Sequence, residues 1–193
     1  MVEMAVARCK QATDANIARQ EAALAIVMAV NAVEVFLNLY FRVVVEEDGF
    51  EEHKSYLLGG INKRKGLDFK VKNWPRKILG NSVDLSKETG KEFYKLKELR
   101  NSIVHFTSSH DTVDLGGTGV IFKGLAETSS YNSLQYSHAR NALDTSRRFV
   151  EQIFRLRGIE ESLLPHALHS WCGVPINKSS KTDAEKRAAF LKR

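Results

Sequence analysis

The sequence lacks most of the features by which the commoner enzyme classes are recognised. It has only two cysteines, Cys9 and Cys172, so it cannot supply a four-thiolate zinc site or a disulfide framework. It also has no glycine-rich phosphate loop, no His-Glu-x-x-His metal site and no Gly-x-Ser-x-Gly nucleophile turn. These absences exclude the enzymes built on those motifs, and they predict a protein that uses no metal and no other cofactor.

Extremes of composition are missing as well. The chain has 193 residues, of which 43% are hydrophobic and 27% charged, close to the averages of ordinary folded proteins. A chain of this length can bury one hydrophobic core without disulfides or metals. We expect one helical domain over residues 1–175, followed by a charged, solvated C-terminal extension over residues 176–193.

The chain shows no secretory leader. Its first eight residues lack the basic-then-apolar order of a signal peptide, which together with free thiols predicts a cytoplasmic protein. Residues 22–45 are apolar and long enough to raise the question of a membrane span. Burying Glu34 and Arg42 in lipid would be costly, however, so the segment is better explained as a core helix and no membrane partner is expected.

The charge balance is mildly basic. Lysine and arginine number 29 against 23 aspartates and glutamates, a formal charge of +6, which favours polyanionic partners such as RNA. Two basic clusters are candidates for RNA contacts: the run Lys63, Arg64, Lys65 and the pair Arg147, Arg148. For the run, a solvated loop is the simpler explanation.

Hydrophobic periodicity predicts an all-α fold, a bundle of four to five helices with a long first helix. We expect helices over residues 14–45, 86–106, 137–158 and 160–171. Residues 46–84 are predicted to form loops around short elements, because Gly59-Gly60 breaks the pattern and Trp74-Pro75 fits the entry to a short helix ending at Leu79. Residues 112–123 are expected to form a small β-hairpin insertion around a glycine turn.

Three potential metal ligands step by threes along the last predicted helix. His166, His169 and Cys172 would lie near one face of that helix. The same helix needs inward-facing apolar residues, and leucines are interleaved with the three side chains. Ordinary packing and surface positions are therefore favoured over a metal site.

The segment with the most specific chemistry closes the second predicted helix. Residues 99–106 read Leu-Arg-Asn-Ser-Ile-Val-His-Phe, so Arg100, Asn101 and His105 lie at a helix end, where side chains can project into a cleft. This segment resembles the signature of the HEPN family, in which an arginine, a polar residue and a histidine close a helix. Residues 31–38, Asn-Ala-Val-Glu-Val-Phe-Leu-Asn, are similar to an early helix of the same family.

The resemblance implies an HEPN-like helical bundle that dimerises around one cleft and cuts RNA without a metal. Histidine titrates near neutral pH, so His105 can accept or donate a proton, while Arg100 holds the scissile phosphate and Asn101 orients that phosphate or the histidine. The expected products carry a 2′,3′-cyclic phosphate and a 5′-hydroxyl. A role as a toxin or phage-defence effector, with an antitoxin or nucleotidyltransferase partner, is what the resemblance would imply.

Glu34 completes the predicted site. With Asn31 and Asn38 it forms a polar line beside the apolar stripe of the first helix, so it can orient Arg100 or His105, although a solvated face explains the line equally well. Arg100 has a structural alternative too, since it can pair with Glu98 or with a carbonyl at the helix end. The alternative function is a noncatalytic HEPN-like module that binds RNA or a protein.

Overall fold

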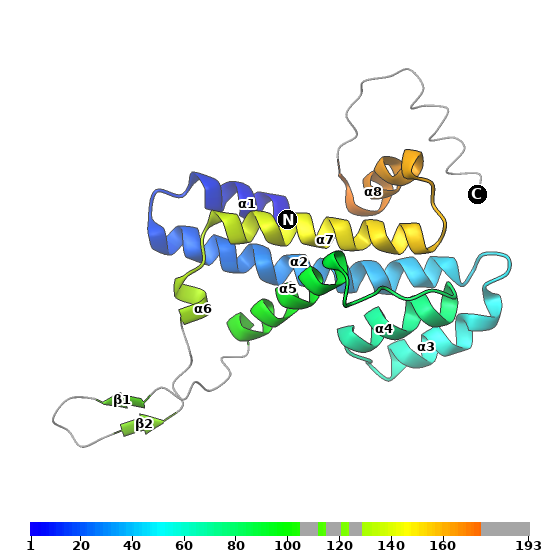
Figure 1. Ribbon diagram of the computed structural model, residues 1–193, viewed down its shortest axis with the longest axis horizontal. Coiled ribbons are helices and arrows are strands. Elements are labelled where there is room, and N and C mark those ends of the chain that lie inside the picture. The colour runs from blue at the N-terminus through cyan, green and yellow to red at the C-terminus, as the bar shows by residue number, and fades with distance from the viewer. Residues whose placement is uncertain (105–111, 115–120, 124–128, 175–193) are drawn as a thin grey trace. The chain divides into compact units, whose positions relative to one another are not determined.

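The computed structural model describes residues 1–104, 112–114, 121–123 and 129–174, and in them the chain is almost entirely helical (Figure 1). The helices are α1 Val2–Gln11, α2 Ala15–Val44, α3 Lys54–Asn62, α4 Leu67–Ile78, α5 Glu88–Val104, α6 Ser129–Asn132, α7 Tyr136–Leu156 and α8 Leu164–Cys172. Single 3-10 turns, Glu51–His53 and Glu161–Leu163, precede α3 and α8. Strands β1 Thr112–Asp114 and β2 Ile121–Lys123 pair antiparallel. The all-α prediction is confirmed.

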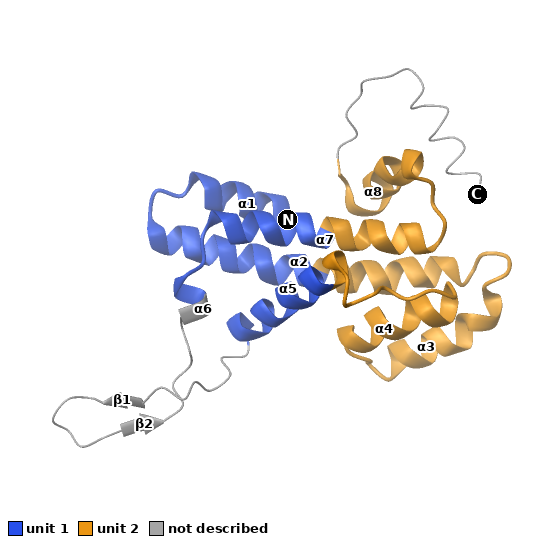
Figure 2. Ribbon diagram, viewed as in Figure 1, with its two compact units in different colours: residues 1–31, 91–146 blue, residues 32–90, 147–193 orange. Residues whose placement is uncertain are grey.

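The chain divides into two compact units, shown in different colours in Figure 2. Unit 1 comprises Met1–Asn31 and Lys91–Ser146, and unit 2 comprises Ala32–Gly90 and Arg147–Arg193. Neither unit is one continuous stretch of sequence. The helices α2 and α7 each supply residues to both units, so each unit is described below by itself.

The long first predicted helix is α2, and it begins where the sequence indicated. The side-chain oxygen Oδ1 of Asp14 accepts hydrogen bonds from the backbone N–H groups of Asn16 at 2.7 Å and Ile17 at 3.0 Å. These bonds satisfy amides that have no partner in the first helical turn. The predicted helix therefore starts one residue after its cap and ends at Val44, as its apolar stripe required.

In unit 1, the helix α1 packs against the start of α2. Ala5, Val6 and Cys9 of α1 are buried, and the Cys9 thiol donates a hydrogen bond to the carbonyl of Ala18 at 3.1 Å. At the surface Arg8 pairs with Glu21 at 3.0 Å. Burial raises the pKa of the Cys9 thiol, so it packs as a neutral, unreactive group. Helix α1 was not predicted from the sequence.

In unit 2, a cluster of aromatic rings joins α2 to α7 and α8. The rings of Phe36 and Tyr40 on α2 make edge contacts with Phe154 on α7, at centroid distances of 5.5 and 5.4 Å. Both also meet Trp171 on α8, at 6.1 and 5.1 Å. Large buried rings supply much of the hydrophobic free energy of a core, and their edge-to-face geometry adds to it.

Residues 46–84 were predicted wrongly as loops around a short helix. They form α3 and α4, which contribute the buried side chains of Leu57, Trp74 and Ile78 to unit 2. Gly59-Gly60 lies within α3 rather than in a loop. A Cβ atom at Gly60 would lie 3.3 Å from Nε1 of Trp74, so a glycine at this position leaves room for the indole of α4.

Pro75 was also misplaced, because it lies within α4 near its C-terminal end rather than at the entry of a helix. Proline inside a helix removes one backbone hydrogen bond and crowds the preceding turn. Here Trp74, Pro75 and Ile78 are all buried in the same turn, so tertiary packing outweighs the local preference. The predicted count of four to five helices was too low, because the described residues also contain α1 and α3, which were not predicted.

The other predicted helices are found with small shifts at their ends. The helix expected over residues 137–158 is α7, which ends at Leu156 before Gly158 at a φ of 83°. The one expected over 160–171 is a 3-10 turn followed by α8. The helix expected over 86–106 is α5, which ends at Val104 within the described residues. The extension over residues 176–193 and the glycine turn between β1 and β2 lie outside them.

By length and composition, α2 could cross a membrane, and it passes this test alone among the described helices. Half of its most apolar 18-residue window is buried inside the protein. Core helices of soluble proteins have the same character.

One glycine allows the chain to turn tightly into α5, and it gives a direct test of the fold. A Cβ atom at Gly90 would lie 2.3 Å from the backbone oxygen of Asp84 and 2.8 Å from the Cα of Leu85. We expect Gly90→Ala to force the backbone apart and to lower the free energy of unfolding by about 1–3 kcal/mol, measured by urea denaturation.

The matched control is Gly59→Ala, in α3, where a Cβ atom would meet nothing within 4 Å. Alanine favours the helix over glycine, so this variant should gain about 0.5–1 kcal/mol. Equal effects of the two substitutions would contradict the close approach at Gly90.

Candidate functional site

Arg100 and Asn101 lie in unit 1, near the C-terminal end of α5, where the sequence analysis placed them. Both side chains are partly exposed. Nε of Arg100 is buried and makes no hydrogen bond within the described residues. A buried donor on a charged group without a partner is costly, and the guanidinium fork matches the oxygens of a phosphate. Arg100 is therefore suited to receive an anion.

The structural alternative for Arg100 finds no support in α5. Glu98, its expected partner, instead pairs with Lys97 at 3.0 Å, and the ammonium of Lys97 lies 4.3 Å from the centre of the Tyr94 ring. Ser102 donates a hydrogen bond to the carbonyl of Leu99 at 2.8 Å and so occupies a carbonyl of the last turns. None of these interactions involves the guanidinium of Arg100.

The predicted grouping of Arg100, His105 and Glu34 stays a prediction. His105 follows the last residue of α5 and lies outside the described residues. Glu34 belongs to unit 2 and Arg100 to unit 1. Within unit 2, however, Glu34 has a partner that the sequence analysis did not anticipate.

That partner is Lys70 of α4. Its ammonium Nζ donates to Oε1 of Glu34 at 2.6 Å and lies 5.6 Å from the centre of the Trp74 ring. The side chain of Lys70 is only 8% exposed, whereas that of Glu34 is 31% exposed. A buried ammonium is tolerated only when a carboxylate and an aromatic face compensate for the lost water. The pair ties α2 to α4, 36 residues apart in sequence.

The Glu34–Lys70 pair forms part of an open groove in unit 2 with a volume of about 460 Å³. One side comes from α2, with Asn38 and Arg42, and the other from the loop between α3 and α4, with Arg64 and Lys65. We call this cavity the basic groove. Within the described residues, this groove brings Glu34, which was predicted for the catalytic site, together with Arg64 and Lys65, which were predicted to bind RNA.

The loop that carries these cations has a defined backbone. N–H of Arg64 donates to the carbonyl of Ile61 at 2.9 Å, and N–H of Lys65 donates to that of Gly60 at 3.0 Å. This pair of bonds is the Schellman motif, which ends a helix with one residue in the left-handed conformation. That residue is Arg64, at a φ of 49°, where most chains have glycine.

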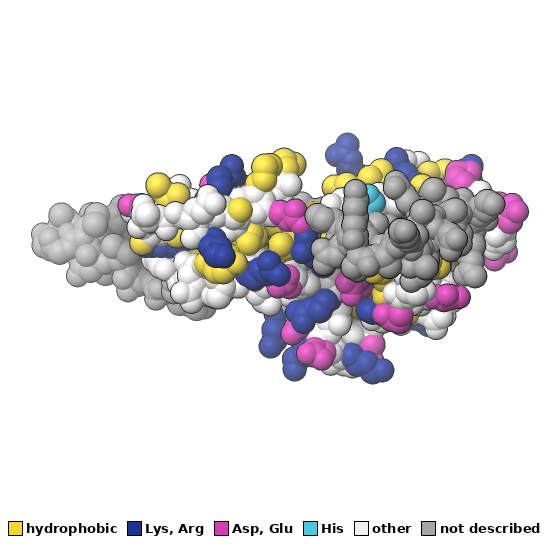
Figure 3. All heavy atoms as spheres, turned by 90° about the horizontal axis from the view of Figure 1, so that it is seen from above, with side chains coloured by type: hydrophobic (Ala, Val, Ile, Leu, Met, Phe, Trp, Pro, Cys, Tyr) yellow, Lys and Arg dark blue, Asp and Glu magenta, His cyan; other side chains and the backbone are white. Residues whose placement is uncertain are grey.

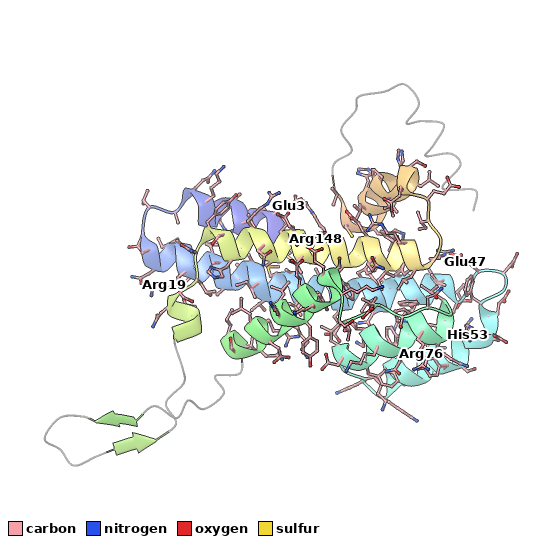
Figure 4. The ribbon with its side chains drawn as sticks, in the orientation of Figure 1. Glu3, Arg19, Glu47, His53, Arg76 and Arg148 are labelled. Carbon is pink, nitrogen blue, oxygen red and sulfur yellow. The ribbon has the colours of Figure 1, made fainter. Side chains whose placement is uncertain are left out.

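The remaining predicted RNA-binding residues do not join the groove. Lys63 is exposed in the same loop but does not line the cavity. Arg147 and Arg148 lie on α7, are partly exposed, and interact with neighbouring groups. Arg148 is labelled in Figure 4. Conversely, Arg42 and Lys70 line the groove and were not predicted as binding residues. A basic run in the sequence reveals only cations that are neighbours along the chain. It cannot reveal cations that lie on separate elements and converge in the fold.

The possible metal ligands of α8 do not converge. His166 is buried, Cys172 is an exposed free thiol, and Nδ1 of His169 lies 3.0 Å from the carbonyl oxygen of Val174. Among the described residues, no group of three or more histidine, cysteine, aspartate or glutamate side chains is placed to hold a metal ion.

The asymmetry of the Glu34–Lys70 pair can be tested by removing each partner. Glu34→Ala leaves the nearly buried ammonium of Lys70 without its carboxylate, so we expect a loss of about 2 kcal/mol in the free energy of unfolding. Lys70→Met keeps an unbranched side chain beside Trp74 and leaves Glu34 in contact with water, so the loss should stay below about 1 kcal/mol. Urea denaturation at pH 7 measures both, and a larger loss for Lys70→Met would refute this account.

Comparison with known protein families, with curated proteins and with solved structures found no match. The likeness to the HEPN family consequently rests on the motif residues of this chain, above all Arg100 and Asn101 on α5 and the histidine that follows that helix.

Proposed function

We propose that the protein is a metal-independent endoribonuclease with an HEPN-like site formed by Arg100, Asn101 and His105. The observation that supports this most directly is the state of Arg100. Its guanidinium lies near the end of α5, is partly exposed, and has a buried Nε with no hydrogen-bond partner in the described structure. A phosphate oxygen would satisfy that donor and the positive charge together.

The chemistry follows from these residue types. The ribose 2′-hydroxyl attacks the neighbouring phosphorus while a histidine removes its proton, and the bond from phosphorus to the 5′-oxygen breaks as that oxygen gains a proton. The products are a 2′,3′-cyclic phosphate and a 5′-hydroxyl, and the attacking oxygen comes from the RNA itself. Arg100 would stabilise the negative charge that builds on the phosphate oxygens, and Asn101 would orient the group.

His105 supplies the proton transfer in this proposal. An imidazole titrates near pH 6.5 and can act as a base or an acid at neutral pH. One histidine cannot hold both roles at once in a single step, so a second His105 from another copy of the chain is the simplest source of the other proton transfer. The orienting role expected of Glu34 stays a prediction, and the described contact of its carboxylate is the ion pair with Lys70.

A noncatalytic module that binds RNA or a protein is the second candidate, and the basic groove is the observation that favours it. Four cations line the groove against one carboxylate, Glu34. Such a surface binds polyanions without cutting them. We place either function in the cytoplasm, where the two free cysteines of this chain would stay reduced. A toxin or phage-defence role, with an antitoxin or nucleotidyltransferase partner, remains part of the proposal.

Cleavage can be tested with single-stranded RNA in excess EDTA. We expect the wild-type protein to produce cyclic-phosphate ends, and His105→Ala and Arg100→Ala to lose about 10²–10⁴-fold in rate. His53→Ala and Arg76→Ala, at the labelled positions around α3 and α4 in Figure 4, are the matched controls and should cut normally. A metal requirement, or a His105→Ala variant as active as the wild type, would exclude this mechanism.

Assembly provides an independent test. We predict a two-fold homodimer in which two copies of His105 share one site. Light scattering should give twice the mass of the chain. When inactive His105→Ala chains are mixed and re-equilibrated with wild-type chains, activity should fall with the square of the wild-type fraction, because a mixed dimer has one histidine. Activity in proportion to that fraction, or an active monomer, would rule out the shared site.

A further inference from the structure

The basic groove of unit 2 has the chemistry of a ligand site that is separate from the Arg100 motif. We propose that it binds single-stranded RNA, with Arg42, Arg64 and Lys65 contacting consecutive phosphates and the apolar part of the groove receiving a base. The choice of RNA as the polyanion rests on the proposed function. The binding itself does not depend on cleavage, so the two proposals can fail separately.

The basic groove keeps a positive charge after internal pairing. Lys70 and Glu34 neutralise one another at 2.6 Å. In the described part of the chain, Arg42, Arg64 and Lys65 form no ion pair with a carboxylate, although Lys65 lies 5.1 Å from the centre of the Phe69 ring. On the face drawn in Figure 3, basic side chains are interspersed with acidic ones. Three cations that converge on one cavity, where the single lining carboxylate is already paired with Lys70, therefore stand out from the general basicity of the chain.

The backbone of Arg64 also indicates a use for its side chain. A non-glycine residue in the left-handed conformation costs about 1–2 kcal/mol, and glycine would avoid that cost at this position of the motif. Unfavourable backbone conformations persist where the side chain has a use that glycine cannot supply. The side chain of Arg64 lines the groove. Arginine in place of glycine at this position therefore adds a positive charge to the groove and costs the fold some stability.

The polar lining between the cations suits a nucleotide as well. Gly66, the residue that precedes α4, borders the groove, so the positive end of a 12-residue helix adds to its potential. On the other side, the carboxamide oxygen of Asn38 is buried and has no hydrogen-bond partner in the described structure. A base amino group could donate to it. The groove thus offers a cation for each phosphate and an acceptor for a base.

The groove also has an apolar wall. Val35 and Leu39, one turn apart on α2, line the groove while 54% and 52% exposed, and Ile61 of α3 lines it too. Aliphatic side chains beside cations suit a nucleotide, which has an apolar base face next to a charged phosphate. A cavity of about 460 Å³ is within the usual range for a ligand of that size. An anionic membrane surface is flat and would reach only the rim, so a strand fits the hollow better.

Binding should be measured with a short fluorescent single-stranded oligoribonucleotide in which every 2′-hydroxyl is methylated. This probe cannot be cut through its own 2′-oxygen, so anisotropy reports binding alone. We expect salt-sensitive binding by the wild-type protein. Arg42→Gln/Lys65→Gln should bind at least about tenfold more weakly, and the dependence of log affinity on log salt should lose about 0.7 for each phosphate contact removed.

Arg64→Gly is the most informative variant, because it separates folding from binding. Glycine suits the left-handed position, so the melting temperature should rise by about 2–4 °C while affinity for the probe falls. Lys77→Gln, an exposed cation near the end of α4 that does not line the groove, is the matched control and should bind like the wild type.

The outcomes are distinct. Weaker binding by the groove variants, with Lys77→Gln unchanged, supports the proposal even if the protein never cuts RNA. Equal binding by all variants overturns it even if the protein does cut RNA. Displacement of the probe by adenosine monophosphate at matched phosphate concentration would assign the groove to a free nucleotide instead. Binding to phosphatidylserine vesicles but not to the probe would assign it to a membrane, and either result overturns the strand proposal.

Discussion

The structure depends above all on the helix α2, which contributes buried side chains to the cores of both units. The 30 residues of α2 supply buried side chains to unit 1 up to Asn31 and to unit 2 from Ala32 onward. In unit 2 its aromatic residues meet α7 and α8, and Glu34 holds the buried ammonium of α4. Since the face of α2 that packs inward is fixed by these contacts, its partly exposed face carries Asn38 and Arg42 into the basic groove.

The parts of the fold that could be predicted from the sequence are those set by neighbours along the chain. Asp14 caps α2 through amides two and three residues away, and an apolar stripe of helical period marks the rest of that helix. The predictions fail where contacts with residues distant in the sequence determine the structure. Gly60 and Pro75 both disfavour a helix locally. Trp74, which lies beside Gly60, and Pro75 itself are buried, and this burial stabilises the helices α3 and α4.

The same division applies to the candidate sites. The motif on α5 and the run at Lys63 to Lys65 were visible because their members are close in sequence. The partner of Glu34 was not, because Lys70 lies 36 residues away on a helix that the sequence analysis had not recognised. Arg42 was noted only as an obstacle to a membrane span, and its place beside Arg64 emerges from the packing of α2 against the loop after α3.

The interleaving of the two units has a consequence for how the chain is made. On the ribosome, Met1–Asn31 emerges first but cannot complete unit 1 until Lys91–Ser146 has followed, and unit 2 awaits residues from Arg147 onward. Both cores therefore close late in synthesis, after most of the apolar surface of α2 has left the exit tunnel. During that interval the nascent chain exposes apolar helix surface of the kind that chaperones bind, and a chain truncated before Ser146 would contain neither unit in full.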